Sequence, residues 1–500
     1  MNRLFSCTNI TRTGMLVMLL WLCGGIAMAA TYYVDANTGK DSNAGTASDA
    51  PWQTLAKVQA TPFAPGDLIL LHCGSIWHER LVIPAGGTED NPLVIGAYKV
   101  MTDPAALPRP AIDGQGIPIP QHEGLVTLSG KAHITLLNLE IARSAGDGLV
   151  ADRCDNLSLV NILAHDNQCH GCQIADSSHL QVERCEFCDN CLDHTAQYAG
   201  LRVTTWHAPI SDIRITRCQI HDNAGGPDIW QNCGNGIYLG ADVRPRPVLR
   251  NVVVERNAIY RNGNFAQNQA GRGITGTCDG DVQILRNDIH DNASAGAYLG
   301  GDAVTVDVTF AYNLFRNNHL RGFGWITDGT VHAYNNTVYS GDAKLTGLGI
   351  EFAGHGTFVI KNNLLCLLPD ARYGSFFAVH AGAAKAVIAH NLYWNLKGGA
   401  GAKVYLWGDF HEMGNYLDFS AWARRAGDAG SREADPKFVN TGAGNFTLQA
   451  TSPARNAGAP VGLTIDFAGN PVPKGAPDIG AFQHSKPASP ARSPKQGSGK

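Results

Sequence analysis

The chain repeats one short pattern of apolar and polar positions. Its two clearest copies are Val252-x-Val254-x-Arg256-Asn257-x-Ile259-x-x-Asn262 and Val282-x-Ile284-x-Arg286-Asn287-x-Ile289-x-x-Asn292. The alternating β-branched residues predict a strand whose every second side chain points to one face. The first Asn then follows at a bend, one more apolar residue turns inward, and the second Asn closes the turn. We interpret this pattern as the unit of a repeat fold.

The slot of the first Asn recurs along the chain and sets the period. Its occupants are Leu139, Ile162, Cys185, Cys218, Asn257, Asn287, Asn313, Asn336, Asn363 and Asn391. Successive slots are 23 to 39 residues apart, and a strand-rich period with insertions of variable length is typical of a parallel β-solenoid. We therefore predict about ten coils. The inward Asn side chains should stack as a ladder in which each amide bonds to its neighbours.

Length and charge fit a single solenoid. The chain has 500 residues and a formal net charge of −4, whereas a nucleic-acid binder normally carries a basic domain. We expect an N-terminal cap with the first coils over residues 30–123, β-helix repeats over 124–400 and a C-terminal capping segment over 401–484. Residues 485–500 contain mostly Ser, Pro, Lys and Gly without an apolar pattern and predict a disordered tail.

The first residues predict an export signal over 1–29. Arg3 and Arg12 precede an apolar run from Met15 to Ile26, and Ala27-Met28-Ala29 offers the small residues at which signal peptidase cleaves. The run is too short to span a bilayer, and no other transmembrane segment is present in the sequence. We therefore expect cleavage after Ala29 and a secreted or periplasmic protein.

Short motifs near both ends resemble the secreted bacterial right-handed parallel β-helix proteins of the pectate-lyase-like superfamily. They include Tyr32-Tyr33-Val34-Asp35, Pro51-Trp52-Gln53-Thr54-Leu55, Ile83-Pro84-Ala85-Gly86-Gly87-Thr88, Ile112-Asp113-Gly114, Ala434-Asp435-Pro436-Lys437-Phe438 and Asp478-Ile479-Gly480-Ala481. The resemblance implies an all-β right-handed parallel β-helix, with a cap helix over 51–58 at one end and a C-terminal capping segment at the other. It also implies action on polysaccharides as a lyase, hydrolase or epimerase, although a fold does not fix a function.

One row of outward side chains is the predicted floor of a substrate groove. A Gly introduces one strand of each coil, and if the next residue points inward the following one points outward. That outward row is Val150, Gln173, Arg202, Tyr238, Thr275, Tyr298, Gly324, Glu351 and Phe377. The longest insertions, Asp189 to Ile210, Ala224 to Arg250 and Gly263 to Gly280, flank its middle and would wall the groove.

Charge in this region favours an anionic polysaccharide as the partner. Between Arg202 and Arg272 there are nine Arg, no Lys and five acidic residues, a local +4, and Arg binds carboxylates through two parallel hydrogen bonds. The alternative is that these arginines are solvated turn residues, as we expect for Arg256 and Arg286. We expect a monomer that binds neither nucleic acid nor a membrane.

For β-elimination at a uronate, the site needs a group that neutralises the carboxylate, a base and an acid. Arg202, Arg272 or a Ca²⁺ ion are candidates for the first role. Tyr238, Tyr298, His194 and His207 are candidates for the others. The resemblance implies that Arg202 could itself be the base. Trp206, Thr275 and Asp228 are further candidate substrate contacts.

Two other classes of function remain open from the sequence. Hydrolysis needs two positioned carboxylates, for which Asp193, Asp228 and Glu351 are the candidates, and a uronate epimerase would share the lyase machinery. A non-catalytic carbohydrate-binding surface protein would show no convergent acid, base and charge. We treat Gly354-His355-Gly356, which superficially resembles a polygalacturonase motif, as a chance match.

The cysteines predict disulfides and buried thiols rather than a metal site. Eleven of the 13 cysteines follow the predicted cleavage point, so at least one is unpaired unless it links two molecules. Cys169-x-x-Cys172 and Cys185-x-x-Cys188-x-x-Cys191, with His170 and His194 nearby, are the alternative zinc ligands. The spacing between these pairs is shorter than in common zinc ribbons. Cys172 and Cys185 also occupy inward slots, where Cys packs as a small apolar residue.

Overall fold

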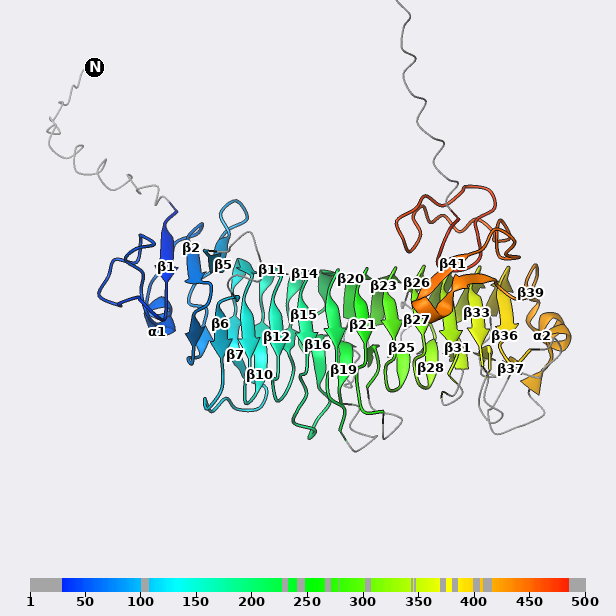
Figure 1. The fold of residues 1–500 in the computed structure, drawn as a ribbon, viewed down its shortest axis with the longest axis horizontal. Helices are drawn as coiled ribbons and strands as arrows, with labels where there is room; N and C mark the ends of the chain where they lie inside the picture. The colour runs from blue at the N-terminus through cyan, green and yellow to red at the C-terminus, as the bar shows by residue number, and fades with distance from the viewer. Residues whose placement is uncertain are drawn as a thin grey trace, which may run out of the picture.

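The computed structural model shows a rod of stacked coils (Figure 1). It describes residues 29–99, 108–226, 233–240, 248–265, 271–277, 279–301, 307–342, 345, 348–368, 375–379, 385–398, 405–407 and 416–484. The leader predicted over 1–29 and the tail over 485–500 lie almost entirely outside these residues. No helix in the described part of the chain is both long enough and apolar enough to cross a bilayer.

Each coil contributes one strand to each of three long sheets, and within the described residues each sheet has 13 strands. We name them sheets A, B and C. Sheet A comprises β1 (Thr31–Val34), β2 (Leu68–His72), β5 (Leu93–Tyr98), β8 (Ala132–Leu137), β11 (Asp155–Val160), β14 (Ser178–Glu183), β17 (Ile210–Thr216), β20 (Val248–Glu255), β23 (Asp279–Leu285), β26 (Asp307–Ala311), β29 (Thr330–Tyr334), β32 (Thr357–Lys361) and β35 (Lys385–Ala389).

Sheets B and C complete the coil. Sheet B comprises β3 (Ile76–Trp77), β6 (Ala111–Asp113), β9 (Glu140–Ala142), β12 (Leu163–His165), β15 (Glu186–Cys188), β18 (Gln219–His221), β21 (Ala258–Tyr260), β24 (Asp288–His290), β27 (Leu314–Arg316), β30 (Thr337–Ser340), β33 (Leu364–Leu367), β36 (Leu392–Asn395) and β39 (Arg432–Glu433). Sheet C comprises β4 (Leu81–Val82), β7 (Gly124–Ser129), β10 (Asp147–Asp152), β13 (Cys172–Ala175), β16 (Ala199–Thr204), β19 (Asn235–Gly240), β22 (Ile274–Thr277), β25 (Ala295–Gly301), β28 (Arg321–Thr327), β31 (Leu348–Ala353), β34 (Phe377–Val379), β37 (Tyr405–Trp407) and β38 (Tyr416–Leu417).

The structure confirms the predicted right-handed parallel β-helix and its ten repeat slots. The ten strands from β8 to β35 of sheet A each lead into one of the predicted slots. Three earlier strands, β1, β2 and β5, extend the sheet towards the N-terminus. Within sheets A, B and C, pairing is parallel except between β37 and β38, and inward residues such as Ile213 and Val252 are fully buried.

The predicted asparagine ladder is present. The side-chain amide of Asn257 donates to Asn287 Oδ1 at 3.0 Å, and Asn287 donates to Asn313 at 3.0 Å. The same bond then links Asn313, Asn336, Asn363 and Asn391 in turn. Because these amides are buried, each must find its partners inside the protein. Stacking identical residues meets that need in the coils from Asn257 to Asn391.

A second ladder runs along the corner between sheets B and C. It joins Asn167, Asn190, Asn223, Asn262, Asn292 and Asn318 through amide bonds of 2.7 to 3.1 Å. This ladder explains the Gly that introduces each strand of sheet C. A Cβ on Gly171 would lie 2.6 Å from Asn190 Nδ2 and 2.7 Å from the Gly200 carbonyl oxygen, so no larger residue fits there.

Both ends of the rod are closed by short helices. At the N-terminal end, α1 (Leu55–Gln59) packs Leu55 and Val58 against the first coil. The helix begins later than the predicted 51–58, because the Thr54 side chain caps it by accepting a hydrogen bond from Lys57 N at 3.1 Å. At the other end, Trp422 of α2 (Phe419–Ala426) stacks on Phe377 with ring centroids 5.5 Å apart.

The last part of the described chain folds back along the side of the rod (Figure 1). It contains the hairpin of β40 (Phe438–Asn440) and β41 (Asn445–Leu448), joined by a 3₁₀ turn at Thr441–Ala443. Asn335 donates to the Asp478 carbonyl at 2.8 Å, and Ala481 N donates to Thr337 Oγ1 at 2.9 Å. Residues after β39 therefore cover a flank of the coils, while α2 closes the end.

Removing the cap of α1 should loosen the N-terminal end of the rod. We expect Thr54→Ala to lower the free energy of unfolding by about 1 kcal/mol, because the N–H of Lys57 loses its acceptor. Hydrogen exchange of the α1 amides should accelerate while exchange in the middle coils is unchanged. Equal exchange at α1 in both proteins would contradict this role of Thr54.

Candidate functional site

The predicted outward row lies on sheet C in the expected register. Val150, Gln173, Arg202, Tyr238, Thr275, Tyr298, Gly324 and Glu351 pair with one another from strand to strand. The last predicted member is wrong, because Ala378 rather than Phe377 pairs with Glu351. Phe377 instead points into the core, where Trp422 stacks on it. Most of the polar members are buried, since Gln173, Tyr238, Thr275 and Glu351 are all at most 6% exposed.

Arg202 and two aromatic rings form the first cluster on this row. The Arg202 guanidinium carbon lies 5.1 Å from the Tyr238 ring centroid and 5.6 Å from that of Trp206. Such a cation over an aromatic face is attracted by the negative face of the ring. The Tyr238 hydroxyl lies 3.2 Å from Gln197 Oε1 and donates to it, which fixes the ring beside the arginine.

A carboxyl and an imidazole that were not predicted as catalytic groups lie beside Arg202, although His170 was named as an alternative zinc ligand. Asp147 and His170 are fully buried, and the His170 backbone N–H donates to Asp147 Oδ1 at 2.8 Å. Burial raises the pKa of Asp147 to about 7, although this hydrogen bond and the positive charge of Arg202 oppose the rise. A carboxyl group whose pKa is raised in this way can both take up and release a proton near neutral pH.

His170 is held neutral in a defined orientation. Burial and the nearby Arg202 hold its pKa well below the usual value. The Ala199 N–H donates to His170 Nδ1 at 3.0 Å, and the Ala199 carbonyl oxygen lies 3.3 Å from the same nitrogen; the shorter contact favours the tautomer with the ring proton on Nε2. Among the described residues, neither this Nε2 nor Asp147 Oδ2 has a hydrogen-bond partner. Both atoms therefore have unused capacity for hydrogen bonding.

A second cluster lies further along the same face. The Tyr298 ring is contacted by two guanidinium groups, with Arg272 at 5.2 Å and Arg321 at 4.4 Å from its centroid. Arg321 forms an ion pair with Glu351, and both side chains are largely buried. Arg272 also donates to Thr275 Oγ1 at 2.9 Å. Arg321 was not selected from the sequence.

Glu351 of the second cluster is too far from Arg202 to act on the same bond. Glu351 is five coils from Arg202, which at about 4.8 Å per coil is about 24 Å. Paired carboxylates for hydrolysis must lie within about 5 to 10 Å of each other. Glu351 is therefore not the partner of a carboxylate near Arg202.

The remaining predicted site residues lie in the insertions around Arg202. His207 Nδ1 lies 2.6 Å from Asp176 Oδ2, and Trp206, 47% exposed, is held through its backbone N–H by the same carboxylate at 2.8 Å. His194 and Asp193 lie in the segment before β16, where Asp193 accepts hydrogen bonds from Thr195. Asp228 lies outside the described residues.

The arginines of this region do not gather in one groove. Arg214 and Arg250 lie on sheet A, while Arg217 is paired with Glu183, Arg256 with Glu255 and Arg261 with Asp222 on the turns. The three strands of a coil lie on three different sheets. Positive charges that are close together in the sequence are therefore distributed around the rod. Of the described arginines in this stretch, Arg202 lies on sheet C, and Arg272, just before β22, contacts Thr275 and Tyr298 of the outward row.

The ten cysteines within the described residues are all buried, and none forms a disulfide. The prediction of buried thiols is confirmed for them, whereas the predicted disulfides are not present. Cys172 and Cys185 lie in the apolar interior as predicted. Cys188 instead points outward on sheet B beside Glu186 and His221.

Comparison with known proteins places the chain in a family. The model of the right handed beta helix region matches residues 120–258 and 210–411, which together span more than half of the 500 residues. The protein therefore belongs to this family of right-handed β-helix proteins.

One similar sequence and one similar structure have names that denote carbohydrate-active enzymes. A lacto-N-biosidase of Bifidobacterium longum subsp. longum is 33% identical over 232 residues, which cover 42% of this chain. The match spans 13% of that protein's length. The crystal structure of pectate lyase Pel9A superposes with a TM-score of 0.51 at 18% identity, covering 92% of this chain and 98% of that one. This second likeness shows the shared fold.

Proposed function

We propose that the protein is a polysaccharide-active enzyme whose active site lies on sheet C around Asp147, Arg202 and Tyr238. We further propose that it cleaves a uronic-acid-containing polysaccharide by β-elimination. The observation that carries this proposal is the buried Asp147 carboxyl, whose pKa is raised to about 7 beside an arginine. Strongly shifted pKa values that arise from burial and a specific charge are typical of catalytic sites.

The arrangement offers each group that β-elimination needs. Arg202 would hold the uronate carboxylate and withdraw electron density from it, which acidifies the adjacent C–H bond. Asp147 in its ionised form would take up that proton; because the side chain is fully buried, this step requires the surrounding residues to open or one water molecule to relay the proton. The C–O bond to the leaving sugar then breaks, a carbon–carbon double bond forms, and the Tyr238 hydroxyl would protonate the departing oxygen.

His170 would position the substrate rather than exchange protons with it. Its Nε2–H is fixed by the bond that Nδ1 accepts from Ala199, at 3.0 Å. Since its pKa is lowered by burial, it stays neutral while Asp147 changes charge. The ring could therefore donate a hydrogen bond to a sugar hydroxyl throughout the reaction.

Hydrolysis is the second candidate, and one structural observation favours it. Burial and, to a smaller extent, the negative charges of Asp147 and Asp193 raise the pKa of the Cys169 thiol, which indicates that the two carboxyl groups lie in the same region. Asp147 with its raised pKa would then be the general acid and Asp193 the second carboxylate. The similarity to a lacto-N-biosidase, a glycoside hydrolase, supports the same alternative.

The products distinguish these reactions. We expect the purified protein to generate the ultraviolet absorbance of an unsaturated uronate from alginate, polygalacturonate or glycosaminoglycans, since only elimination creates that double bond. Each substrate should be tested with calcium and with a chelator, because a bound Ca²⁺ could share the role of Arg202. New reducing ends without absorbance would establish hydrolysis instead. An altered uronate composition in an uncut polymer would establish epimerisation.

Arg202→Gln should weaken this activity selectively. Losing a charge-assisted hydrogen bond to the carboxylate should lower kcat/KM on the order of 10- to 100-fold. Arg250→Gln is the matched control, because Arg250 is exposed at the end of the sheet A strand β20. If both variants lose activity equally, Arg202 has no special role. If binding to polysaccharide is found with no product of any kind, the protein is a binding module.

We also propose that the mature protein is exported. The predicted cleavage after Ala29 would leave β1, which begins at Thr31, as the first strand of the rod. Mass determination of the N-terminus of the secreted protein tests this directly.

A further inference from the structure

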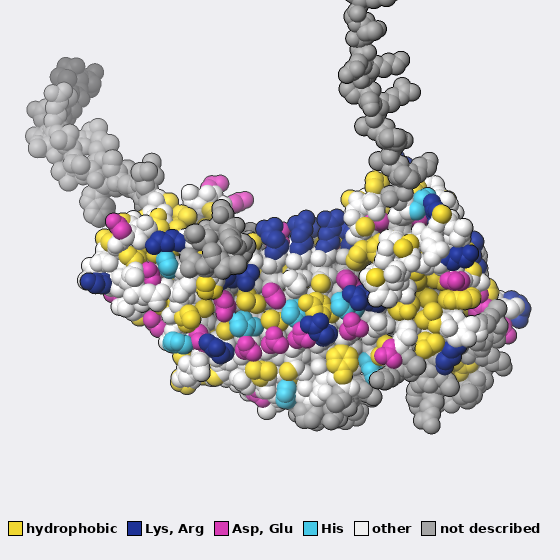
Figure 2. Space-filling model, viewed as in Figure 1, with side chains coloured by type: hydrophobic (Ala, Val, Ile, Leu, Met, Phe, Trp, Pro, Cys, Tyr) yellow, Lys and Arg dark blue, Asp and Glu magenta, His cyan; other side chains and the backbone are white. Residues whose placement is uncertain are grey.

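The outward face of sheet B carries an ordered column of titratable and aromatic side chains. His165, Cys188, His221, Tyr260 and His290 are in register on successive strands. Tyr260 is sandwiched between the rings of His221 and His290, with centroids 4.6 and 4.9 Å away and planes within 6°. Figure 2 shows histidine and acidic side chains gathered on the face that β12, β15 and β21 present in Figure 1. This face is separate from the proposed active surface on sheet C.

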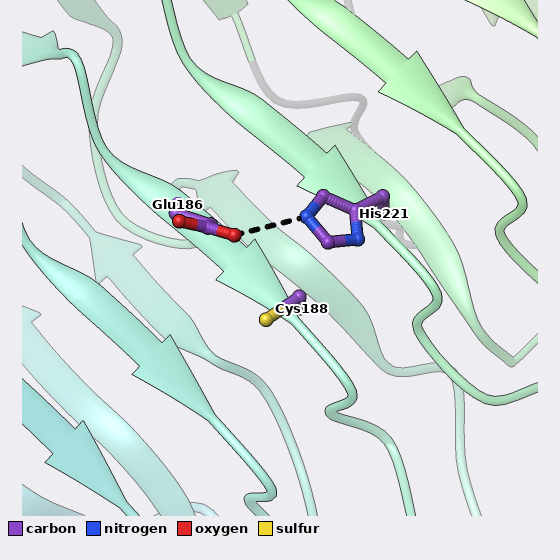
Figure 3. Close-up of side chains that lie close together, drawn as sticks. All are labelled: Glu186, Cys188 and His221. Carbon is purple, nitrogen blue, oxygen red and sulfur yellow. Dashed lines mark hydrogen bonds and ion pairs between the residues drawn. The ribbon is translucent and has the colours of Figure 1, made fainter.

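Three side chains of different chemistry converge within this column (Figure 3). Glu186 and Cys188 are two residues apart on β15 and so face the same side, and His221 follows from the neighbouring strand β18. Glu186 Oε1 lies 3.1 Å from His221 Nε2. The carboxylate oxygen, the thiol sulfur and one imidazole nitrogen all lie within 4.8 Å of one another. No other group of three such ligands is found among the described residues.

The imidazole is held as in known metal sites. His221 Nδ1 lies 2.7 Å from Asp222 Oδ2, and Arg261 pairs with the same carboxylate. A histidine that binds a metal usually donates its other ring N–H to a carboxylate, which fixes the tautomer and directs the free nitrogen to the ion. Here that free nitrogen is Nε2, which faces Glu186.

Comparison with His165 and His290, the other histidines of the column, shows how the surroundings of His221 differ. His165 contacts Glu140 and Asp166 at 3.2 and 2.7 Å, and His290 contacts Asp291 at 2.7 Å. Those histidines also have acidic partners, and Cys188 lies in register between His165 and His221. Among the described residues, the thiol, a carboxylate oxygen and an imidazole nitrogen come within 4.8 Å of one another at His221. The Glu186 and His221 side chains are 34% and 12% exposed, so an ion can reach the group from solvent.

We propose that Glu186, Cys188 and His221 bind a divalent transition-metal ion of the Zn²⁺ class. Thiolate, imidazole and carboxylate together match this class rather than Ca²⁺ or Mg²⁺, which take oxygen ligands. Three protein ligands leave a fourth position for water. The thiol and the imidazole nitrogen would lose any proton they carry as the ion binds, and no oxidation is involved.

The ion would connect the two ends of one coil. Glu186 and Cys188 immediately precede the coil that carries Arg202, and His221 ends it. Between them lies the predicted insertion from Asp189 to Ile210. A bound ion would therefore fix the base of this wide coil without touching sheet C. This inference does not depend on the reaction that sheet C performs.

Cobalt titration of the full-length protein tests the site. Co²⁺ bound to a thiolate gives a near-ultraviolet charge-transfer band, and we expect this band to saturate at one ion per chain. Cys188→Ser and His221→Gln should each remove it. Zn²⁺ should raise the thermal midpoint of the unmodified protein but not that of His221→Gln, because only the folded state forms the site.

Two control variants make the test specific. His290→Gln alters a histidine of the same column without an adjacent thiol, and Cys366→Ser alters a buried thiol elsewhere on sheet B. Both should keep the cobalt band. The proposal is overturned if the folded protein binds no Co²⁺ up to the millimolar range. It is equally overturned if the band persists in His221→Gln, which retains every cysteine.

Discussion

Asp147→Asn is expected to lower the rate of polysaccharide cleavage by about 10²- to 10⁴-fold, the usual contribution of a positioned acid or base. Asparagine keeps the oxygen that accepts the His170 N–H, 2.8 Å away in the wild type, but it cannot take up or release a proton. The measurement is kcat on the substrate that gives product with the wild type. Asp152→Asn is the control, because Asp152 lies on the same strand and pairs at the surface with Arg153.

The same substitution should stabilise the fold above neutral pH. Folding raises the pKa of Asp147 from 3.8 to about 7, so ionisation opposes folding as pH rises from about 4 to 7. At pH 8 the asparagine variant should gain up to about 4 kcal/mol. Near pH 3 the carboxyl is protonated in both states, and the gain should vanish. An equal gain at pH 3 and pH 8 would show that burial of the charge is not the cause.

The pH dependence of the wild-type rate separates the two proposed reactions. If Asp147 is the base of an elimination, its ionised form is active, and kcat/KM should rise as pH increases through about 7. If it is the acid of a hydrolysis, the protonated form is active, and the rate should fall over the same range. A rate without any transition between pH 6 and 8 would remove Asp147 from both mechanisms.

Asn287→Ala should be the most destabilising of the substitutions considered. Asn287 accepts two hydrogen bonds from Asn257 at 3.0 Å and donates to Val254 O and Asn313 Oδ1 at 2.8 and 3.0 Å. Its loss leaves buried donors and acceptors unpaired in two neighbouring coils, at about 1 kcal/mol or more for each bond. We expect a cost of about 4 kcal/mol in the free energy of unfolding, measured by denaturant titration.

Gln283→Ala provides the comparison for this variant. Gln283 lies on the same coil and has a similar amide, but it points outward from sheet A and is exposed. Its replacement should change stability by less than about 0.5 kcal/mol. Similar losses in both variants would mean that the asparagine ladder contributes no more than surface contacts do.

The parts of the molecule that repeat could be predicted from the sequence. The slot occupied by Asn257 and Asn287 recurs because each coil turns the same buried corner at that position. The hydrogen bond between the two side chains confirms that they stack. The register of Arg202 with Tyr238 follows from the same period. In a stacked solenoid, the spacing of residues along the sequence therefore predicts which side chains are neighbours on the surface.

The chemistry of the site does not repeat, and that is why part of it was missed. Asp147 and His170 occupy equivalent positions in neighbouring coils, each two residues before a buried residue of sheet C. In the next two coils the equivalent positions hold Ala199 and Asn235, which cannot act as an acid or a base. Nothing in the pattern marks such a column. The raised pKa of Asp147 depends on burial that the strand pattern does not reveal. Glu351 was predicted in the same site as Arg202 because both lie in the outward row of sheet C. The period of the sequence predicts that row, but it does not show which of its residues lie close enough to contact one substrate bond.

The two asparagine ladders divide the rod into mechanically different parts. One joins Asn257 to Asn391 and the other Asn167 to Asn318, so they overlap in the coils that begin at Asn257, Asn287 and Asn313. In that overlap each coil is joined to its neighbours by asparagines at two corners. The adjacent coils on either side are joined at one corner, and the coil of Leu139 contributes an asparagine to neither ladder. If unfolding of the coils starts at one end of the rod, it should therefore slow when it reaches the coils of β22, β25 and β28. The coil of Arg202 lies outside this doubly joined segment, so its opening should cost less free energy than the opening of the coils of β22, β25 and β28.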